Sequence, residues 1–103
     1  MEIQYIDGKD VSLTYDTIYG RDMIVYIHNM DENLDALVPF TRILDMDYDK
    51  KKRKLYIVTA DFPEPKRILF YDVDGKLGKD IFKLWQKHNV MHGGADVTNL
   101  YVV

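Results

Sequence analysis

The sequence contains no cysteine, and this absence removes several kinds of chemistry. The chain can form no disulfide, no thiolate zinc site and no cysteine nucleophile. Serine is almost as scarce: Ser12 is the only one and has no G-x-S-x-G context, so an activated serine is not expected. The six glycines are dispersed apart from Gly93-Gly94, so no glycine-rich phosphate loop is present.

Long apolar runs are also missing from the sequence. No stretch approaches the length of a membrane span, and no basic segment followed by an apolar one indicates a leader peptide. We therefore expect a cytoplasmic protein that does not enter a membrane. With 103 residues, of which 47% are hydrophobic and 30% charged, the chain is predicted to form a single domain over 1–103 with a modest core.

The charges are distributed unevenly between the two halves of the chain. Residues 1–49 carry a net charge of −8, whereas residues 50–103 carry +5. This asymmetry predicts an acidic or a basic recognition face, unless the two halves interleave in the folded domain. The candidate acidic positions are Asp31, Glu32, Asp35, Asp45, Asp47 and Asp49. The candidate basic positions are Lys50, Lys51, Lys52, Arg53, Lys54, Lys79, Lys83 and Lys87.

Short apolar segments with alternating polarity dominate the chain and are typical of strands. Segments 2–6 and 11–15 predict a first hairpin around Asp7 to Asp10. Within 43–48, alternation places Leu44 on the same side as Met46 and Tyr48. The run of basic residues at 50–54 predicts an exposed hairpin tip. Further strands are predicted at 23–28, 55–60, 68–73 and 98–103.

Two segments show helical signals. Ile81, Leu84, Trp85 and His88 have the spacing of one buried helix face, which predicts a helix over 79–89 followed by a Gly-Gly loop. Residues 31–38 predict a second short helix that ends before a proline. The fold class is therefore α+β. We expect one domain with a mostly antiparallel twisted sheet of about six or seven short strands, a C-terminal amphipathic helix packed on the sheet, and a possible second short helix.

One catalytic resemblance lies in "ILFYDVDGK". An apolar strand followed by Asp72-Val73-Asp74-Gly75 resembles the nucleophile strand of the haloacid-dehalogenase phosphatases. The resemblance implies Asp72 as the nucleophile and Asp74 as the proton carrier. A threonine usually follows the glycine in that family, and Lys76 stands here instead. Only 28 residues follow Gly75, too few for the parallel sheet of that family. Asp and Gly are also ordinary turn residues, so we do not expect catalysis.

A second resemblance lies in Glu64-Pro65-Lys66. This triplet resembles the E-x-K of the PD-(D/E)xK nucleases. The resemblance implies Glu64 and Lys66 as site residues of a metal-dependent nuclease, with Asp45, Asp47 or Asp49 as the upstream carboxylate and Asp47 as the position used in this alternative. Prolines on both sides of Glu64 predict a turn rather than a strand. The nuclease is kept as an alternative.

Two other patterns suggest metal ligands. Asp45-x-Asp47-x-Asp49 begins like a calcium-binding EF-hand loop, but lysine and tyrosine replace the glycine and glutamate that such a loop requires. His88, His92 and Asp96 recur every four residues, as ligands on one helix would, but Gly93-Gly94 interrupts that helix. We expect no metal, no cofactor and no catalytic residue.

One longer stretch is similar to the central hairpin of the bacteriophage inhibitors of uracil-DNA glycosylase. The shared positions are Tyr48, Asp49, Thr59, Asp61, Pro63, Glu64, Lys66, Asp72 and Gly75. The similarity covers under a third of the chain and requires gaps, and this sequence has no counterpart to the acidic Gln-Glu-Ser-Ile strand of those inhibitors.

The leading hypothesis is a non-enzymatic binding module that contacts another protein, as an inhibitor or accessory protein of phage or mobile-element type. It depends on the missing catalytic motifs, the acidic first half and the eight tyrosines. The candidate interaction loop contains Asp61, Phe62, Glu64, Lys66 and Arg67. Nucleic acid bound by the basic second half is the main alternative, and a second copy of the chain is another possible partner.

Overall fold

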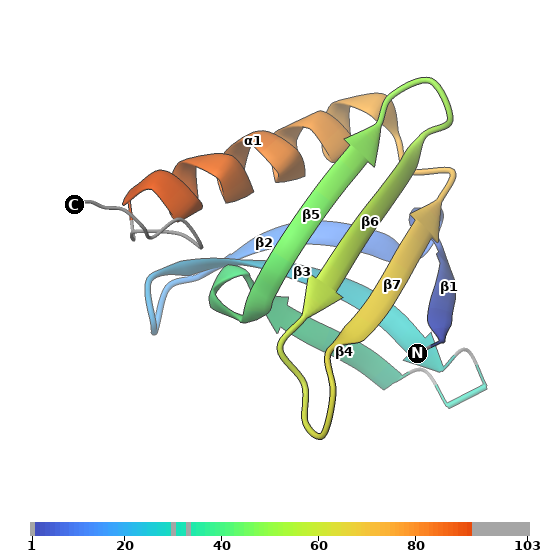
Figure 1. Cartoon of the computed structure of the whole chain (residues 1–103), viewed down its shortest axis with the longest axis horizontal. Coiled ribbons are helices and arrows are strands. Elements are labelled where there is room, and N and C mark those ends of the chain that lie inside the picture. Colours follow the sequence, from blue (N-terminus) through green and yellow to red (C-terminus); the bar gives the residue numbers. More distant parts are fainter. Residues whose placement is uncertain (1, 30, 33, 92–103) are drawn as a thin grey trace.

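The computed structural model describes residues 2–29, 31, 32 and 34–91, which form seven strands and one long helix (Figure 1). The strands are β1 (Ile3–Asp7), β2 (Val11–Asp16), β3 (Arg21–Asn29), β4 (Leu34–Pro39), β5 (Ile43–Asp49), β6 (Lys54–Thr59) and β7 (Lys66–Tyr71). Two short 3-10 turns, η1 (Gly8–Asp10) and η2 (Phe40–Arg42), precede β2 and β5, and the helix α1 spans Gly75–Met91. The predicted α+β class with mostly antiparallel pairing is confirmed.

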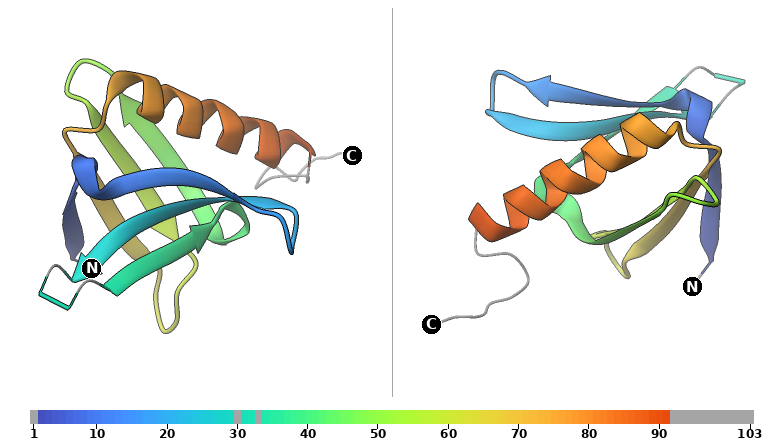
Figure 2. Two further views of the ribbon diagram at one scale, coloured as in Figure 1. Left: turned by 180° about the vertical axis from the view of Figure 1, so that it is seen from behind. Right: turned by 90° about the horizontal axis from the view of Figure 1, so that it is seen from above.

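The strands are divided between two sheets rather than lying in one. One sheet has the order β1-β7-β6-β5, and the other has the order β2-β3-β4. All pairings are antiparallel except that of β1 with β7. The sheets face each other with their strands crossing, and α1 lies across one open side between them (Figure 2).

A single hydrophobic core fills the space between the sheets and the helix. Ile24 and Tyr26 of β3 point inward, and Tyr26 meets Phe70 of β7 edge to face with ring centroids 5.2 Å apart. From α1, Ile81 and Trp85 complete the same cluster. Burial of these apolar side chains is the main term that holds the two layers together.

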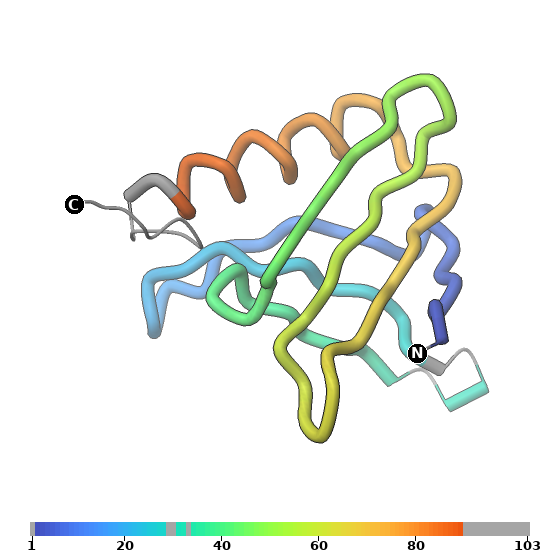
Figure 3. The backbone as a smooth tube through the Cα atoms, viewed as in Figure 1, coloured from blue at the N-terminus to red at the C-terminus, as the bar shows by residue number. Residues whose placement is uncertain are grey.

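The predicted hairpin between the first two strands is wrong. β1 pairs in parallel with β7, whereas β2 pairs with β3 in the other sheet. The backbone in Figure 3 turns sharply between them at η1, where Asp7 Oδ1 accepts a hydrogen bond of 3.0 Å from the backbone N–H of Lys9. The polar segment from Asp7 to Asp10, which was predicted as a hairpin turn, therefore carries the chain from one sheet to the other.

The predicted helix over 31–38 is also wrong, because residues 34–39 form β4. In this strand Ala36 and Val38 face the core and pair with Tyr26 and Ile24 of β3. Eight residues make a weak helix by themselves. Pairing with β3 satisfies the backbone of this segment and buries Val38, so the tertiary contact overrides the local helical pattern.

A bulge in β5 changes which side chains face the core. The pairing with β6 shifts between Ile43 and Asp45, so Ile43 and Met46 are both buried while Leu44 is exposed. The predicted grouping of Leu44 with Met46 is therefore wrong. An extra residue on one strand reverses the alternation on one side of the bulge.

The helix begins four residues before its predicted start. Asp74 Oδ2 accepts hydrogen bonds from the backbone N–H groups of Lys76 (3.1 Å) and Leu77 (3.2 Å), and so caps the helix. The predicted Gly-Gly loop at 90–96 and the predicted strand at 98–103 lie outside the described residues, except that 90 and 91 still belong to α1. In the described part of the chain, no helix has the length and apolarity required to cross a membrane.

Candidate functional site

The outward face of the four-stranded sheet carries an unusual set of side chains. Figure 1 looks onto the β5, β6 and β7 part of this face, with β1 at its right edge, and no other element lies over these three strands in that view. We define the tyrosine face as the outward apolar and aromatic positions of β1, β6 and β7, which are Ile3, Tyr5, Tyr56, Val58, Leu69 and Tyr71.

The strand register places these side chains in rows across the sheet. Tyr5 of β1 is paired with Leu69 of β7, and Leu69 is paired with Tyr56 of β6. Tyr56 is in turn paired with Asp47 of β5. A row of two tyrosines and a leucine thus crosses three strands and ends at an aspartate on the edge strand.

The tyrosine face is accessible to solvent. Tyr5 is 64% exposed and Tyr71 is 40% exposed, while Tyr56 and Leu69 are half-buried by their neighbours. A sheet with one face in water normally alternates hydrophobic inside with polar outside. β6 and β7 instead carry large apolar groups on both faces, and their inward sides already supply the core.

Three aspartates line the edge of this face. Asp45, Asp47 and Asp49 of β5 are exposed and pair with Val58, Tyr56 and Lys54 of β6. We call these three carboxylates the acidic edge. The other predicted acidic positions lie elsewhere, since Asp35 belongs to β4 of the other sheet, and Asp31 and Glu32 lie in the turn before it.

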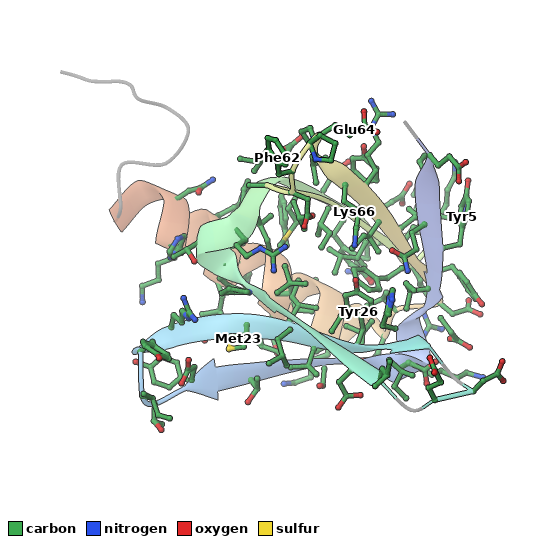
Figure 4. All side chains as sticks on the ribbon, turned by 90° about the horizontal axis from the view of Figure 1, so that it is seen from below. Tyr5, Met23, Tyr26, Phe62, Glu64 and Lys66 are labelled. Atoms are coloured by element: carbon green, nitrogen blue, oxygen red, sulfur yellow. The ribbon has the colours of Figure 1, made fainter. Side chains whose placement is uncertain are left out.

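The loop between β6 and β7 extends beyond the end of the tyrosine face (Figure 1). Its base is anchored by Asp61. The carboxylate of Asp61 accepts a hydrogen bond from the hydroxyl of buried Thr59, and its Oδ1 forms an ion pair with Arg42 Nη2 at 2.8 Å. The backbone N–H of Ala60 also donates to the carbonyl of Arg42 at 2.8 Å. Beyond this base Phe62 is 96% exposed and projects from the outside of the loop (Figure 4).

The residues predicted to form one interaction loop therefore have different places and roles in the structure. Asp61 anchors the loop, Phe62 and Glu64 are exposed on it, and Lys66 begins β7. Arg67 lies on the outward face of the sheet, where it pairs with Val58 and Ile3. A shallow cleft beside the loop is lined by Glu64 and Lys66 but not by Asp47, which the nuclease alternative requires.

The predicted basic face separates into two regions. Lys50, Lys79 and Lys83 line one cleft between the β5–β6 turn and α1, together with Lys76, which the sequence prediction missed. Lys87 lines a different cleft with Tyr19, Arg21 and His88 near the other end of the helix. The remaining basic residues of the turn are Lys51, Lys52 and Arg53, and Lys54 is the first residue of β6.

Two of the tyrosines that the structure describes have a raised pKa, and neither belongs to the tyrosine face. Burial raises the pKa of Tyr26, and the charge of Asp61 raises it further while Arg42 opposes this. Burial also raises the pKa of Tyr48, whose hydroxyl lies 3.4 Å from the carbonyl oxygen of Val73. Both phenols therefore stay protonated at neutral pH and act as structural groups.

Metal-ligand geometry does not appear in the described ranges. Within residues 2–29, 31, 32 and 34–91, no three His, Cys, Asp or Glu side chains come together in an arrangement that could hold an ion. His88 packs edge to face against Phe40 with ring centroids 6.1 Å apart. His92 and Asp96, the other two predicted ligands, lie outside the described residues.

Comparison with known protein families, curated proteins and solved structures gives no match to this chain.

The sequence does not indicate that the residues at the centre of this site lie together. It singles out the eight tyrosines as a group, but it does not place Tyr5, Leu69 and Tyr56 on one face of one sheet. The available signal was that 55–58 and 68–71 are apolar or aromatic at consecutive positions, which requires both faces of each strand to carry such groups. The sequence does not indicate whether the second face of these two strands is open to solvent or packed against another element.

Proposed function

We propose that this protein is a non-enzymatic binding module that engages a basic protein partner through the tyrosine face, the acidic edge and Phe62. The observation that carries the proposal is the row Tyr5–Leu69–Tyr56–Asp47, which places exposed aromatic area directly beside negative charge. Tyrosine is enriched at protein interfaces because its ring supplies contact area and its hydroxyl keeps a polar contact.

The size of the face requires the loop to take part. From ordinary strand spacing and rise, the four-stranded face measures roughly 15 to 20 Å on a side, or about 300 Å² in projection. A stable interface buries about 800 Å² on each partner. The sheet alone falls short of this area. Phe62, which projects from an anchored loop at the end of the sheet, extends the contact area beyond the last strand pair.

The charge of the site favours a protein over a nucleic acid as partner. The acidic edge lies along the tyrosine face, and the carboxylates of Asp45, Asp47 and Asp49 would repel a phosphate backbone that crossed the sheet. A protein surface with apolar groups flanked by lysine or arginine complements both features.

The proposal can be tested by placing a photo-crosslinking amino acid at Tyr5 or at Phe62, with Ser12 as the control position. Ser12 is also exposed on a strand, but it belongs to the three-stranded sheet. Irradiation in host lysate should join the first two variants to the same basic protein and leave the Ser12 variant free. Equal crosslinking from Ser12, or no crosslinked protein from either test position, would refute the proposal.

A charge reversal then tests the acidic edge with the purified crosslinked protein. Asp47→Lys should weaken binding by roughly tenfold or more at low salt, because it places a like charge against the basic surface of the partner. Asp35→Lys, on the other sheet, should leave the affinity within about twofold. If the chain crosslinks only to a second copy of itself and sediments as a dimer, the proposal of a separate protein partner is wrong.

A further inference from the structure

A basic cleft lies between the β5–β6 turn and the first turns of α1, apart from the tyrosine face. Its volume is about 410 Å³, and it is lined by Lys50, Gly75, Lys76, Lys79, Asp80 and Lys83. Four lysine side chains from two separate elements therefore line one open cleft. In the sequence, the two strands β6 and β7 separate Lys50 from the helix, so only the fold brings these charges together.

The turn on one side of the cleft is fixed in place. The carbonyl of Arg53 accepts a hydrogen bond of 2.9 Å from the backbone N–H of Val73, and Arg53 Nε donates at 3.2 Å to the carbonyl of Val73. Asp49 Oδ1 accepts from the backbone N–H groups of Lys51 (3.0 Å) and Lys52 (3.1 Å), which closes the turn internally. The backbone of the turn that carries Lys50 is thus held in place relative to the start of the helix before any ligand arrives.

The helix side of the cleft is equally constrained. Gly78 packs so closely against the ring of Tyr48 that a Cβ on Gly78 would lie 2.3 Å from the ring carbons. Asp74 caps the helix through the backbone of Lys76 and Leu77, so its carboxylate is engaged with the first turn. The two sides of the cleft are joined by packing and hydrogen bonds, and little reorganisation would be needed on binding.

Only one of the four lysines of the cleft has an ion-pair partner among the described residues. Lys76 Nζ lies 3.4 Å from Asp80 Oδ2, but within the described ranges Lys50, Lys79 and Lys83 form no ion pair. Lys79 and Lys83 are also four apart on one helix face, an arrangement that destabilises an isolated helix by repulsion. A cluster of like charges held together by a rigid scaffold gains stability when a polyanion occupies it.

The lining of the cleft indicates the chemistry of its ligand. Lysine binds phosphate as a point charge, and several lysines around a small volume favour several phosphate charges close together. Among the described residues, no aromatic side chain lines the cleft, so a nucleobase would find no ring there on which to stack. The acidic edge also begins beside Lys50 at Asp49, which opposes a long polyanion leaving the cleft along β5.

We propose that this cleft is a binding site for a compact ligand that carries two or more phosphate groups, held by Lys50, Lys76, Lys79 and Lys83. The ligand chemistry is shared by a soluble polyphosphate and by the polyphosphorylated headgroup of a lipid. The site is independent of the tyrosine face and contains none of its residues.

Calorimetric titration with pyrophosphate and with inositol hexakisphosphate tests the site directly. The double variant Lys79→Gln/Lys83→Gln should bind inositol hexakisphosphate more weakly by roughly tenfold or more, because two charge-assisted contacts are removed. The matched control Lys51→Gln/Lys87→Gln removes the same charge outside the cleft and should change affinity by less than about threefold. All four lysines are exposed, and a thermal melt followed by Trp85 fluorescence verifies that each variant is folded.

The results distinguish a lipid headgroup from a soluble polyphosphate as the ligand, and they also define the outcomes that would overturn the proposal. Vesicles containing phosphatidylinositol bisphosphate that bind the protein better than phosphatidylserine vesicles of equal charge would support the site and assign a lipid source. Binding of the soluble polyphosphates without vesicle binding would support a soluble ligand. An equal loss in both double variants, no binding of any of these probes, or tighter binding of a single-stranded oligonucleotide would overturn the proposal.

Discussion

The ring of Tyr48 packs directly against Gly78, where a Cβ would lie 2.3 Å from two ring carbons. This contact joins β5 to the second turn of α1 and orients the helix across the open side of the two sheets. The hydroxyl of the same tyrosine lies 3.4 Å from the Val73 carbonyl just before the helix. Glycine at 78 is therefore required by close packing.

Gly78→Ala should destabilise the protein by about 1 to 2 kcal/mol, because the new methyl group must displace the Tyr48 ring. The same change in a Tyr48→Ala background should have the opposite sign and stabilise by up to about 1 kcal/mol, since alanine has the higher helix propensity. Urea unfolding followed by Trp85 fluorescence measures both values. Equal effects in the two backgrounds would contradict the proposed contact.

Gly8→Ala should be more damaging than Gly20→Ala. A Cβ on Gly8 would lie 2.4 Å from the carbonyl oxygen of Tyr71 and 2.7 Å from the backbone nitrogen of Val73, and backbone atoms at such a junction cannot easily move. We expect a loss of roughly 3 kcal/mol or more.

Gly20 serves as the comparison for this prediction. It has a positive φ of 65°, but the nearest atom to a new Cβ would be the Tyr15 hydroxyl at 3.5 Å. Its replacement by alanine should therefore cost only about 1 kcal/mol of backbone strain. Chemical denaturation of the two variants ranks the costs, and a Gly20 variant less stable than the Gly8 variant would refute the assignment.

The anchor of the β6–β7 loop should depend more on Asp61 than on its ion-pair partner. Arg42→Ala removes a partly exposed salt bridge and should cost less than about 1 kcal/mol. Asp61→Ala also removes the acceptor for the hydroxyl of buried Thr59 and should cost about 1 to 3 kcal/mol. Asp61→Asn retains an acceptor and should lie between the two. Denaturant unfolding gives the order, and an Arg42 variant as unstable as Asp61→Ala would be inconsistent with it.

Stability should fall in alkaline solution because of the buried phenols. Burial raises the pKa of Tyr26 above its ordinary value of about 10, so the folded protein retains this proton to a higher pH than the unfolded chain. The contribution is complete below pH 10 and is lost as pH rises beyond it, because the unfolded chain then releases its proton first. Unfolding free energies measured from pH 8 to 11 should decline less steeply in Tyr26→Phe. An identical slope in both proteins would exclude Tyr26 as a contributor.

Local patterns in the sequence were sufficient to predict much of the secondary structure. The basic run 50–54 was recognised as a hairpin tip, and the spacing of Ile81 and Trp85 predicted the buried face of the helix correctly. Both signals are local, since a turn and a helix are each specified within a few consecutive residues. The start of the helix was missed because Asp74 was read as turn chemistry, whereas its carboxylate caps α1.

The choice of partners between strands could not be predicted in the same way. Alternation within a strand indicates which side chains are buried, but it does not indicate the strand that supplies the hydrogen bonds. The pairing of β1 with β7 and the formation of β4 in place of a helix are both decided by contacts between distant segments.

The candidate sites also depend partly on composition and partly on contacts between distant segments of the chain. The composition makes the chain rich in tyrosine, divided in charge and free of cysteine, and these properties limit the chemistry available to it. The arrangement of Tyr5, Leu69 and Tyr56 in one open row, and of Lys50 and Lys79 along one cleft, arises only when the chain folds. The physical reason is that a surface site is assembled from residues far apart in the chain, and their proximity is set by how the two sheets and the helix bury their common core.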